Sequence, residues 1–230
     1  MPNISRDTLM VEKDTYYPIN ILRTVHQQKT SYLFIKRILD VLGALVGIIL
    51  ILPVFLILAV MIKLEDPSGS VFFYQMRVGK DEKQFKMYKF RSMVSNAEEL
   101  LEGLLDKNEI EGHMFKMKED PRITRVGKFI RKTSMDELPQ LWNVLIGDMS
   151  LVGPRPPLVR EVEQYSDYHK QRLLVTPGCT GLWQVSGRND VSFKKMVELD
   201  LKYIKNRSIL LDVKIILKTC KVLLGSKDAY

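Results

Sequence analysis

The chain has 230 residues, of which 46% are hydrophobic, and it carries a formal net charge of +8. This length suits one domain with at most a small appendage, and the apolar share is sufficient for a hydrophobic core. A pI near 9.3 predicts an anionic partner, such as a membrane surface, a nucleotide or a nucleic acid. The two cysteines and three scattered histidines exclude a disulfide framework and a zinc site of ordinary Cys/His spacing.

The first segment, residues 1–30, is polar and of mixed charge. It lacks the apolar centre of a signal peptide, so we expect a mobile tail with at most a short helix.

Residues 41–62 form an uncharged apolar run that contains Pro53. As a straight helix the run would be about 33 Å long, the thickness of a bilayer core, so length alone predicts a transmembrane helix. Pro53 argues against this, because it removes a backbone donor and clashes with the preceding turn. Basic residues also flank both ends, whereas a single span carries them mainly on its cytoplasmic side: Lys36, Arg37, Lys63, Arg77, Lys80, Lys83, Lys86 and Lys89. We favour a re-entrant helix that breaks at Pro53 and leaves by the same face, over a spanning helix or a soluble core helix.

The rest of the chain predicts an α+β fold that is mostly helical. Aromatic and alternating apolar residues over 71–90 indicate a small β-hairpin, with its turn at 79–82. A capping-box pattern at Ser95–Glu98 opens a helix to about residue 105, followed by a polar loop over 106–120. Further helices are predicted over about 123–132, 135–145, 158–174, 192–205 and 208–224, with loops over 147–157 and 176–188. The last helix is apolar with lysines on one side, which fits a membrane interface and core packing equally well.

An adjacent acid pair, Asp136 and Glu137, stands where the helix over 135–145 begins. With Thr133 or Ser134 as the N-cap, both acids fall in the first turn, where the helix dipole would lower a carboxylate pKa. Such acids are common, so these residues alone favour an ordinary helix start. A carboxylate in this setting can also attack phosphorus to give an acyl phosphate, a reaction that needs Mg²⁺ and cations to neutralise charge.

Several cations could supply that charge, although any one of them is by itself typical of a solvated surface. They are Lys89, Arg91, Arg131, Arg155 and Arg188. Arg155 stands between two prolines, which stiffens its backbone and suits a bidentate grip on phosphate. The chain has no Gly-x-Gly-x-x-Gly, no Walker A loop and no Gly-x-Ser-x-Gly elbow, which argues against the enzyme classes that use them.

Five segments together resemble a known family. They are the apolar run with Pro53, Tyr88-Lys-Phe-Arg-Ser-Met93, Arg131-Lys-Thr-Ser-Met-Asp-Glu-Leu-Pro-Gln-Leu-Trp-Asn-Val-Leu145, Gly147-Asp-Met-Ser-Leu-Val-Gly-Pro-Arg-Pro156 and Thr176-Pro-Gly-Cys-Thr-Gly-Leu-Trp-Gln-Val-Ser-Gly-Arg188. Over about residues 31–230 the chain resembles the bacterial sugar transferases, monotopic polyprenyl-phosphate phosphoglycosyltransferases that start capsule, exopolysaccharide and glycan synthesis.

The resemblance implies a Mg²⁺-dependent ping-pong reaction at the acid pair. Asp136 would attack the β-phosphate of a UDP-sugar, release UMP and pass the hexose phosphate to undecaprenyl phosphate. Glu137 would assist as a Mg²⁺ ligand or as a base, with Asp136 and Glu137 both near the metal. Lys89, Arg131 and Arg155 match positions that hold phosphates or the nucleotide, and Pro53 matches the break of the re-entrant anchor. Some members have a serine before that proline, where this chain has Leu52.

The resemblance also implies an organisation for the whole chain. We expect a polar tail over 1–30, a re-entrant anchor over 31–66 and a cytoplasmic, interfacial transferase domain over 67–230, at the cytoplasmic face of the bacterial inner membrane. Larger members carry four more membrane helices in front, so this chain is expected to be a compact form, and a homodimer is an allowed assembly. Attraction to anionic lipid accounts for the positive charge without nucleic acid. The alternatives are a membrane phosphotransferase with direct ternary-complex transfer and, from another class, a membrane-anchored nucleic-acid-binding module.

Overall fold

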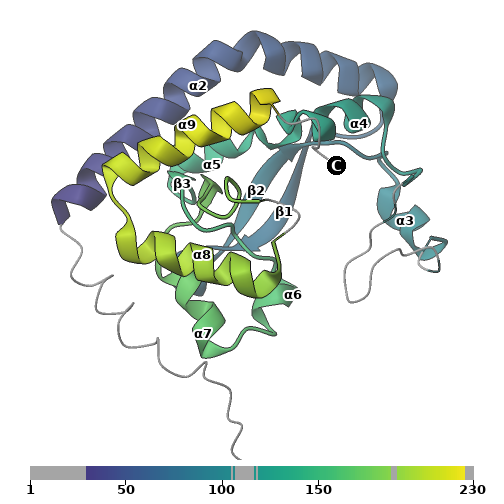
Figure 1. Cartoon of the computed structure of the whole chain (residues 1–230). Helices are drawn as coiled ribbons and strands as arrows, with labels where there is room; N and C mark the ends of the chain where they lie inside the picture. The colour runs from purple at the N-terminus through teal and green to yellow at the C-terminus, as the bar shows by residue number, and fades with distance from the viewer. Residues whose placement is uncertain (1–29, 105, 107–116, 118, 188–190, 226–230) are drawn as a thin grey trace, which may run out of the picture.

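The computed structural model describes residues 30–104, 106, 117, 119–187 and 191–225. The predicted tail over 1–29, most of the predicted loop over 106–120 and Arg188 therefore lie outside the described residues. Within them the fold is α+β and mostly helical, with small sheets and one long apolar helix near the start. Figure 1 shows α2 arching over one side of the molecule, with α9, α5 and α4 beneath it and α6, α7 and α8 at the opposite side.

Helix α2 runs from Thr30 to Glu65 and contains Pro53. Its helical conformation continues through the proline, so the expected break of the helix is wrong, although α2 bends along its course (Figure 1). Its outward face is apolar and exposed, with Leu50 72% accessible. By length and composition α2 could cross a membrane, and no other helix among the residues described here meets both criteria.

Both ends of α2 are bound to the same folded unit. Near its start, Lys36 pairs with Asp212 at 2.9 Å, and the Arg37 guanidinium donates to the carbonyl oxygens of Val144 and Leu145. At its end, the Glu65 carboxylate accepts from the backbone N–H groups at 125 and 126, at 2.7 and 3.0 Å, and so caps the next long helix, α4. Because free N–H groups at a helix start attract carboxylates, this contact fixes the end of α2 against α4.

The predicted hairpin over 71–90 is confirmed. Strands β1 (Phe72–Val78) and β2 (Gln84–Phe90) pair antiparallel, from Phe72 opposite Phe90 to Val78 opposite Gln84. The short 3₁₀ helix η1 (Lys80–Glu82) makes the turn. Strand β2 turns Phe85, Met87 and Phe90 into the core, so the hairpin presents its other residues, among them Lys89, along a fixed edge.

A second, parallel sheet was not predicted. Strands β3 (Ser150–Val152) and β4 (Gly178–Thr180) lie inside the segments expected to be loops. Their backbones come very close beside the strands, since a Cβ on Gly178 would lie 2.0 Å from the Gly153 nitrogen. This contact joins the segment that carries Arg155 to residues 176–188, which we call the glycine-rich segment.

Other predicted helices are shorter or interrupted. Helix α3 (Ala97–Glu102) ends before residue 105, and the capping box is absent, since the N-cap is Asn96 and its side chain makes no capping bond. The Ser95 hydroxyl instead bonds that of Ser68. Helix α4 (Arg125–Lys132) forms as expected, whereas the helix over 135–145 is divided into a 3₁₀ turn, η3 (Met135–Glu137), and α5 (Gln140–Ile146). The helix over 158–174 is broken into α6 (Val159–Val162), α7 (Asp167–Lys170) and the 3₁₀ helix η4 (Gln171–Leu174).

The last two helices, α8 (Phe193–Asn206) and α9 (Ile209–Gly225), confirm their predictions. Helix α9 is amphipathic in its packing. Ile215 is buried in the core with Ile204 of α8, whereas Leu210 and Leu217 are 65% and 64% exposed. One face of α9 therefore packs on the core, and the exposed face carries apolar side chains together with Lys214 and Lys218. Each of the two expected environments is thus available to one face.

Candidate active site

The acid pair is positioned by an unusual turn after α4. Ser134 adopts a left-handed backbone conformation, with φ at 56°, and Asp136 and Glu137 follow it in η3. Neither acid lies in the first turn of an α-helix, since α5 starts only after Pro139, and the Ser134 side chain makes no capping bond. The predicted N-cap arrangement is therefore wrong. The left-handed residue reverses the chain sharply, which aims the two carboxylates towards the hairpin.

Lys89 faces the acid pair from β2. Its ammonium lies 2.7 Å from Glu137 Oε1 and 3.7 Å from Asp136 Oδ2, so one cation serves both carboxylates. The Asp136 side chain is 12% exposed and that of Glu137 43% exposed, which leaves Glu137 more open to a ligand. Lys89 stands in a different sequence motif from the acid pair, and the fold brings the three side chains together.

The two carboxylates have pKa values displaced in opposite directions. Burial, together with the neighbouring Glu137 charge, raises the pKa of Asp136 above its usual value, against the opposing effects of Lys89 and Arg131. Burial also opposes ionisation of Glu137, but Lys89, Arg155 and Arg77 outweigh it and lower the pKa of that carboxyl. The expected lowering by a helix dipole is therefore wrong for Asp136, because η3 offers no α-helical first turn and burial dominates.

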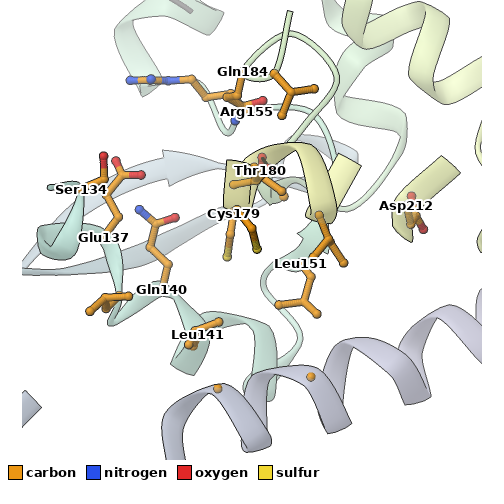
Figure 2. Close-up of a pocket in the computed structure, with 18 of the residues that line it drawn as sticks. Ser134, Glu137, Gln140, Leu141, Leu151, Arg155, Cys179, Thr180, Gln184 and Asp212 are labelled. Carbon is orange, nitrogen blue, oxygen red and sulfur yellow. Dashed lines mark hydrogen bonds between the residues drawn. The ribbon is translucent and has the colours of Figure 1, made fainter. Parts of the chain in front are cut away.

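Two further predicted cations line the same cleft. The Arg131 side chain extends from the last turn of α4, where its Nε donates to Ser92 Oγ at 2.8 Å. Arg155 follows β3, with its guanidinium 5.9 Å from the centre of the Trp183 ring. Figure 2 shows Arg155 on the opposite wall of the cleft from Leu141, with Ser134 and Glu137 at one side. Carboxylates and cations therefore surround a single space, as expected of a phosphate-handling site.

Of the other two predicted cations, Arg91 has a structural contact away from the cleft. Arg91 donates to Asp66 Oδ2 at 3.0 Å and to the Asp66 carbonyl oxygen at 2.6 Å, which ties the end of β2 to the end of α2. It is absent from the residues that line the cleft. Arg188 lies outside the described residues.

Arg77 belongs to the site, and the sequence did not single it out for this role. It is 5% exposed, lines the cleft and donates to the Pro156 carbonyl oxygen at 3.0 Å. Burial, with the charge of Arg155 nearby, lowers its pKa to about 10. Arg77 thus braces the chain next to Arg155 while adding positive potential near Glu137. Its sequence neighbourhood gave no signal beyond its place in a basic flank.

The glycine-rich segment forms another wall of the cleft. Cys179 and Thr180 of β4, then Trp183 and Gln184, line a space of about 800 Å³ that continues from the acid pair. The sequence predicted a loop here, within one of the segments that carry the family resemblance, and assigned no role to these side chains. The Cys179 thiol has a strongly raised pKa because it is buried among protein atoms, so it acts as a neutral apolar group.

Metal binding at this site would depend on the acid pair. No group of three or more His, Cys, Asp or Glu side chains suited to a metal occurs among the described part of the chain. Asp136 and Glu137 supply a carboxylate pair beside the cleft, however, and Mg²⁺ is often held by one or two carboxylates together with substrate phosphates and water. The pair therefore fits a Mg²⁺ ion that is bound jointly with a phosphate ligand.

Comparison with known proteins identifies the class. The family described as bacterial sugar transferase matches residues 31–226, and the chain belongs to the bacterial sugar transferase family. It is 51% identical to the galactosyl transferase CpsE of Streptococcus agalactiae over 199 residues, which are 85% of this chain and 43% of that protein. It is 47% identical to the undecaprenyl-phosphate galactose phosphotransferase of Salmonella typhimurium over 206 residues, covering 88% of this chain and 43% of that one.

A shorter relative matches almost throughout. The exopolysaccharide production protein ExoY of Rhizobium meliloti is 42% identical over 199 residues, which are 85% of this chain and 88% of ExoY. The chain thus spans less than half the length of the first two relatives and most of the third. The resemblance predicted from the sequence motifs is confirmed at the level of the family.

Proposed function

We propose that the chain transfers a hexose 1-phosphate from a UDP-sugar to undecaprenyl phosphate, releases UMP and thereby starts the synthesis of an exopolysaccharide, capsule or related glycan. The observation that carries this proposal is the Asp136–Glu137 pair, which faces Lys89 and shares one cleft with Arg131 and Arg155. The printed name of the Salmonella relative, with undecaprenyl phosphate as acceptor and galactose phosphate as the transferred group, supports it.

In the proposed reaction Asp136 is the nucleophile. One carboxylate oxygen attacks the β-phosphorus of the UDP-sugar, the bond from that phosphorus to the bridging oxygen breaks, and UMP leaves with the bridging oxygen. The sugar phosphate remains on Asp136 as an acyl phosphate. A phosphate oxygen of undecaprenyl phosphate then attacks the same phosphorus, which restores the carboxylate and gives a lipid diphosphate sugar.

The other groups neutralise charge and orient the substrates. Lys89 offsets the negative charge of the two carboxylates until an anionic substrate arrives. Arg131 and Arg155 offer donors for phosphate oxygens. Mg²⁺ held by Asp136 and Glu137 with the substrate phosphates would add charge neutralisation at the phosphorus. Glu137 remains ionised through its cation neighbours, which suits either a metal ligand or a base for the acceptor.

The proposal includes a one-sided membrane anchor over residues 31–66 and a cytoplasmic transferase domain over 67–230. Support comes from α2, whose start contacts α9 and α5 and whose end contacts α4. When both ends of a helix are bound to one folded unit, both ends lie at the same side of the bilayer. The exposed apolar face between them, with Ile49 61% and Leu56 62% accessible, would enter the lipid. The cytoplasmic face of the inner membrane is where a UDP-sugar and a lipid acceptor meet.

The proposal is tested with purified protein in detergent or lipid nanodiscs. UDP-glucose, UDP-galactose and their N-acetyl forms are supplied in turn with undecaprenyl phosphate and Mg²⁺, and UMP and the lipid product are followed. At least one donor is expected to give equal amounts of UMP and lipid-linked sugar phosphate, and Asp136→Asn to give neither. Failure of every UDP-sugar, or full activity of Asp136→Asn, would contradict the proposal.

A further inference from the structure

The cleft that contains the acid pair extends well beyond it. Figure 2 shows Glu137 and Asp212 at opposite sides of the drawn site, with Cys179, Thr180 and Leu151 between them and Leu141 close to the ribbon of α2. All six residues line the same space of about 800 Å³. The cations that suit phosphate, Lys89, Arg131 and Arg155, are grouped with the acid pair. The space towards α9 therefore has a different chemistry.

This second part of the cleft is a groove between two helices, which we call the α2–α9 groove. Helix α2 contributes Leu39, Gly43 and Gly47, and α9 contributes Ile209, Val213 and Ile216. In each helix these positions recur at intervals of three or four residues, so each helix turns one continuous apolar stripe towards the space. The floor is Leu141 of α5 and Leu151 of β3. The walls of the α2–α9 groove are therefore mainly apolar. Their polar lining residues are Lys36 and Asp212, which pair with each other, together with Thr219 and Cys220.

The α2–α9 groove opens towards the surface that carries the uncovered apolar side chains. Leu39 and Val213 line the cleft and are each 44% exposed, so they form its mouth. Outside the mouth stand Leu42 on α2 and Leu210 on α9, which are 53% and 65% exposed. At one end the Lys36–Asp212 ion pair ties the two helices together. A molecule entering sideways from lipid would thus meet mainly apolar side chains between the rim and the floor.

The polar donor cannot use such a surface. A UDP-sugar carries hydroxyls, phosphates and a base along its whole length, and burying those groups against hydrocarbon without partners is costly. A ligand that fits the whole cleft has a phosphate at one end and a hydrocarbon chain at the other. We infer that the α2–α9 groove binds the first isoprenoid units of the lipid acceptor while its phosphate lies at Asp136, an inference that rests on the proposed function.

The test separates the two half-reactions. Val213→Trp fills the mouth of the groove, and Leu217→Trp is the matched control, because Leu217 lies on the same helix, is 64% exposed and does not line the cleft. UMP release from the donor in the absence of acceptor reports folding and the acid pair. Transfer of the sugar phosphate from the enzyme that already carries it is then measured. The acceptors are undecaprenyl phosphate and geranyl phosphate, which has only two isoprene units.

Val213→Trp is expected to release UMP as the unaltered protein does. It should lower kcat/KM for undecaprenyl phosphate by about tenfold through lost hydrocarbon contacts. Its kcat/KM for geranyl phosphate should change much less. Leu217→Trp is expected to behave like the unaltered protein. Equal behaviour of the two variants, or an equal loss with both acceptors, would overturn the groove assignment. Absence of UMP release from the unaltered protein would instead overturn the proposed function, and the groove assignment with it.

A second measurement needs no substitution. An isoprenyl phosphate with a photoreactive group on its first isoprene units is irradiated with the unaltered protein in nanodiscs. The α9 peptide that contains Val213 is expected to be labelled, and undecaprenyl phosphate but not phosphatidylglycerol should prevent the labelling. Equal protection by phosphatidylglycerol would mean that the groove takes any membrane lipid chain, and labelling confined to other segments would place the acceptor elsewhere; either result overturns the inference.

Discussion

At the scale of single residues, Asp136 and Glu137 are adjacent in the chain and have different surroundings. The Asp136 side chain is 12% exposed and its pKa is raised, whereas that of Glu137 is 43% exposed, accepts from Lys89 at 2.7 Å and has a lowered pKa. Neighbouring carboxylates with pKa values moved apart can take different chemical roles. In the proposed mechanism the buried Asp136, with its raised pKa, is the more basic oxygen nucleophile, and Glu137, with its lowered pKa, is the group that stays ionised.

Lys89 is the residue on which this difference depends most. Lys89→Met removes the charge shared by the two carboxylates, so they repel each other and any incoming phosphate. We expect kcat/KM for UMP release to fall by roughly a hundredfold or more, as when a preorganised charge partner is removed from a reaction centre. Lys89→Arg should retain more activity than Lys89→Met. Near-normal kcat/KM in Lys89→Met would contradict the role given to this ion pair.

Ser134 supplies the turn that aims the acids. Its φ of 56° is strained for a side chain and especially for a β-branched one. Ser134→Val is expected to lower the free energy of unfolding by about 1–2 kcal/mol and to reduce UMP release, because the turn before Asp136 must distort. Ser134→Gly, which adopts this conformation freely, should remain active. Denaturant unfolding and UMP release check both variants, and equal effects of Val and Gly would exclude a backbone role.

Some site residues could be predicted from the sequence and others could not. Asp136, Glu137, Lys89 and Arg155 stand in long motifs, so the sequence identified them. Arg77 is held at the site by a hydrogen bond to the Pro156 carbonyl oxygen, 79 residues away. No local sequence pattern predicts such a bond. The direction of the Asp136 pKa was also predicted wrongly, because burial depends on the packing of several distant segments.

At the scale of secondary structure, the long periodic elements were predicted well. The hairpin, α4, α8 and α9 follow from alternation or helical spacing within one segment. Strands β3 and β4 were missed because each has three residues and forms only through its partner, 28 residues along the chain at Ser150 and Gly178. The prediction of one helix over 158–174 was wrong, because the apolar spacing of that segment does not indicate the turns between α6, α7 and η4.

Arg91 holds together the junction between β2 and α2, and its substitution distinguishes this structural role from substrate binding. It joins the end of β2 to the end of α2 through two bonds to Asp66, and it is only 9% exposed. Arg91→Met is expected to lower the free energy of unfolding, because the Asp66 carboxylate loses its cation and the Asp66 carbonyl oxygen loses its donor. UMP release per folded molecule should change little. Normal stability with a large loss of kcat would return Arg91 to the substrate-binding role that the sequence predicted.

At the scale of the whole molecule, α2 is the element on which the proposed membrane anchor depends. Lys36 binds α9 near the start of α2, and Glu65 caps α4 at its end. The sequence supplied the length and the proline, but it could not show that both ends reach the same domain. Helix continuity through Pro53 means that the change of direction is a bend within an unbroken helix, and the bend keeps the apolar face outward.

Cysteine labelling tests this topology in sealed inverted and right-side-out vesicles. With Cys179 and Cys220 replaced by serine, single cysteines are introduced by Ser31→Cys, at the start of α2, and by Ser70→Cys, between α2 and β1. Both positions are exposed. A membrane-impermeant maleimide is expected to label both from the cytoplasmic side only. Labelling of the two positions from opposite sides would show a spanning helix and would refute the one-sided anchor.

The covalent step at Asp136 is tested most directly by the mass of the intact protein after brief exposure to a UDP-sugar and Mg²⁺ without lipid acceptor. The account predicts one molecule of UMP per enzyme and a protein heavier by one sugar phosphate, with the added mass on the peptide that contains Asp136. Undecaprenyl phosphate should then remove it, and Asp136→Asn should never acquire it. Steady transfer to lipid by a protein that never gains this mass would contradict the covalent mechanism and indicate direct transfer between two bound substrates.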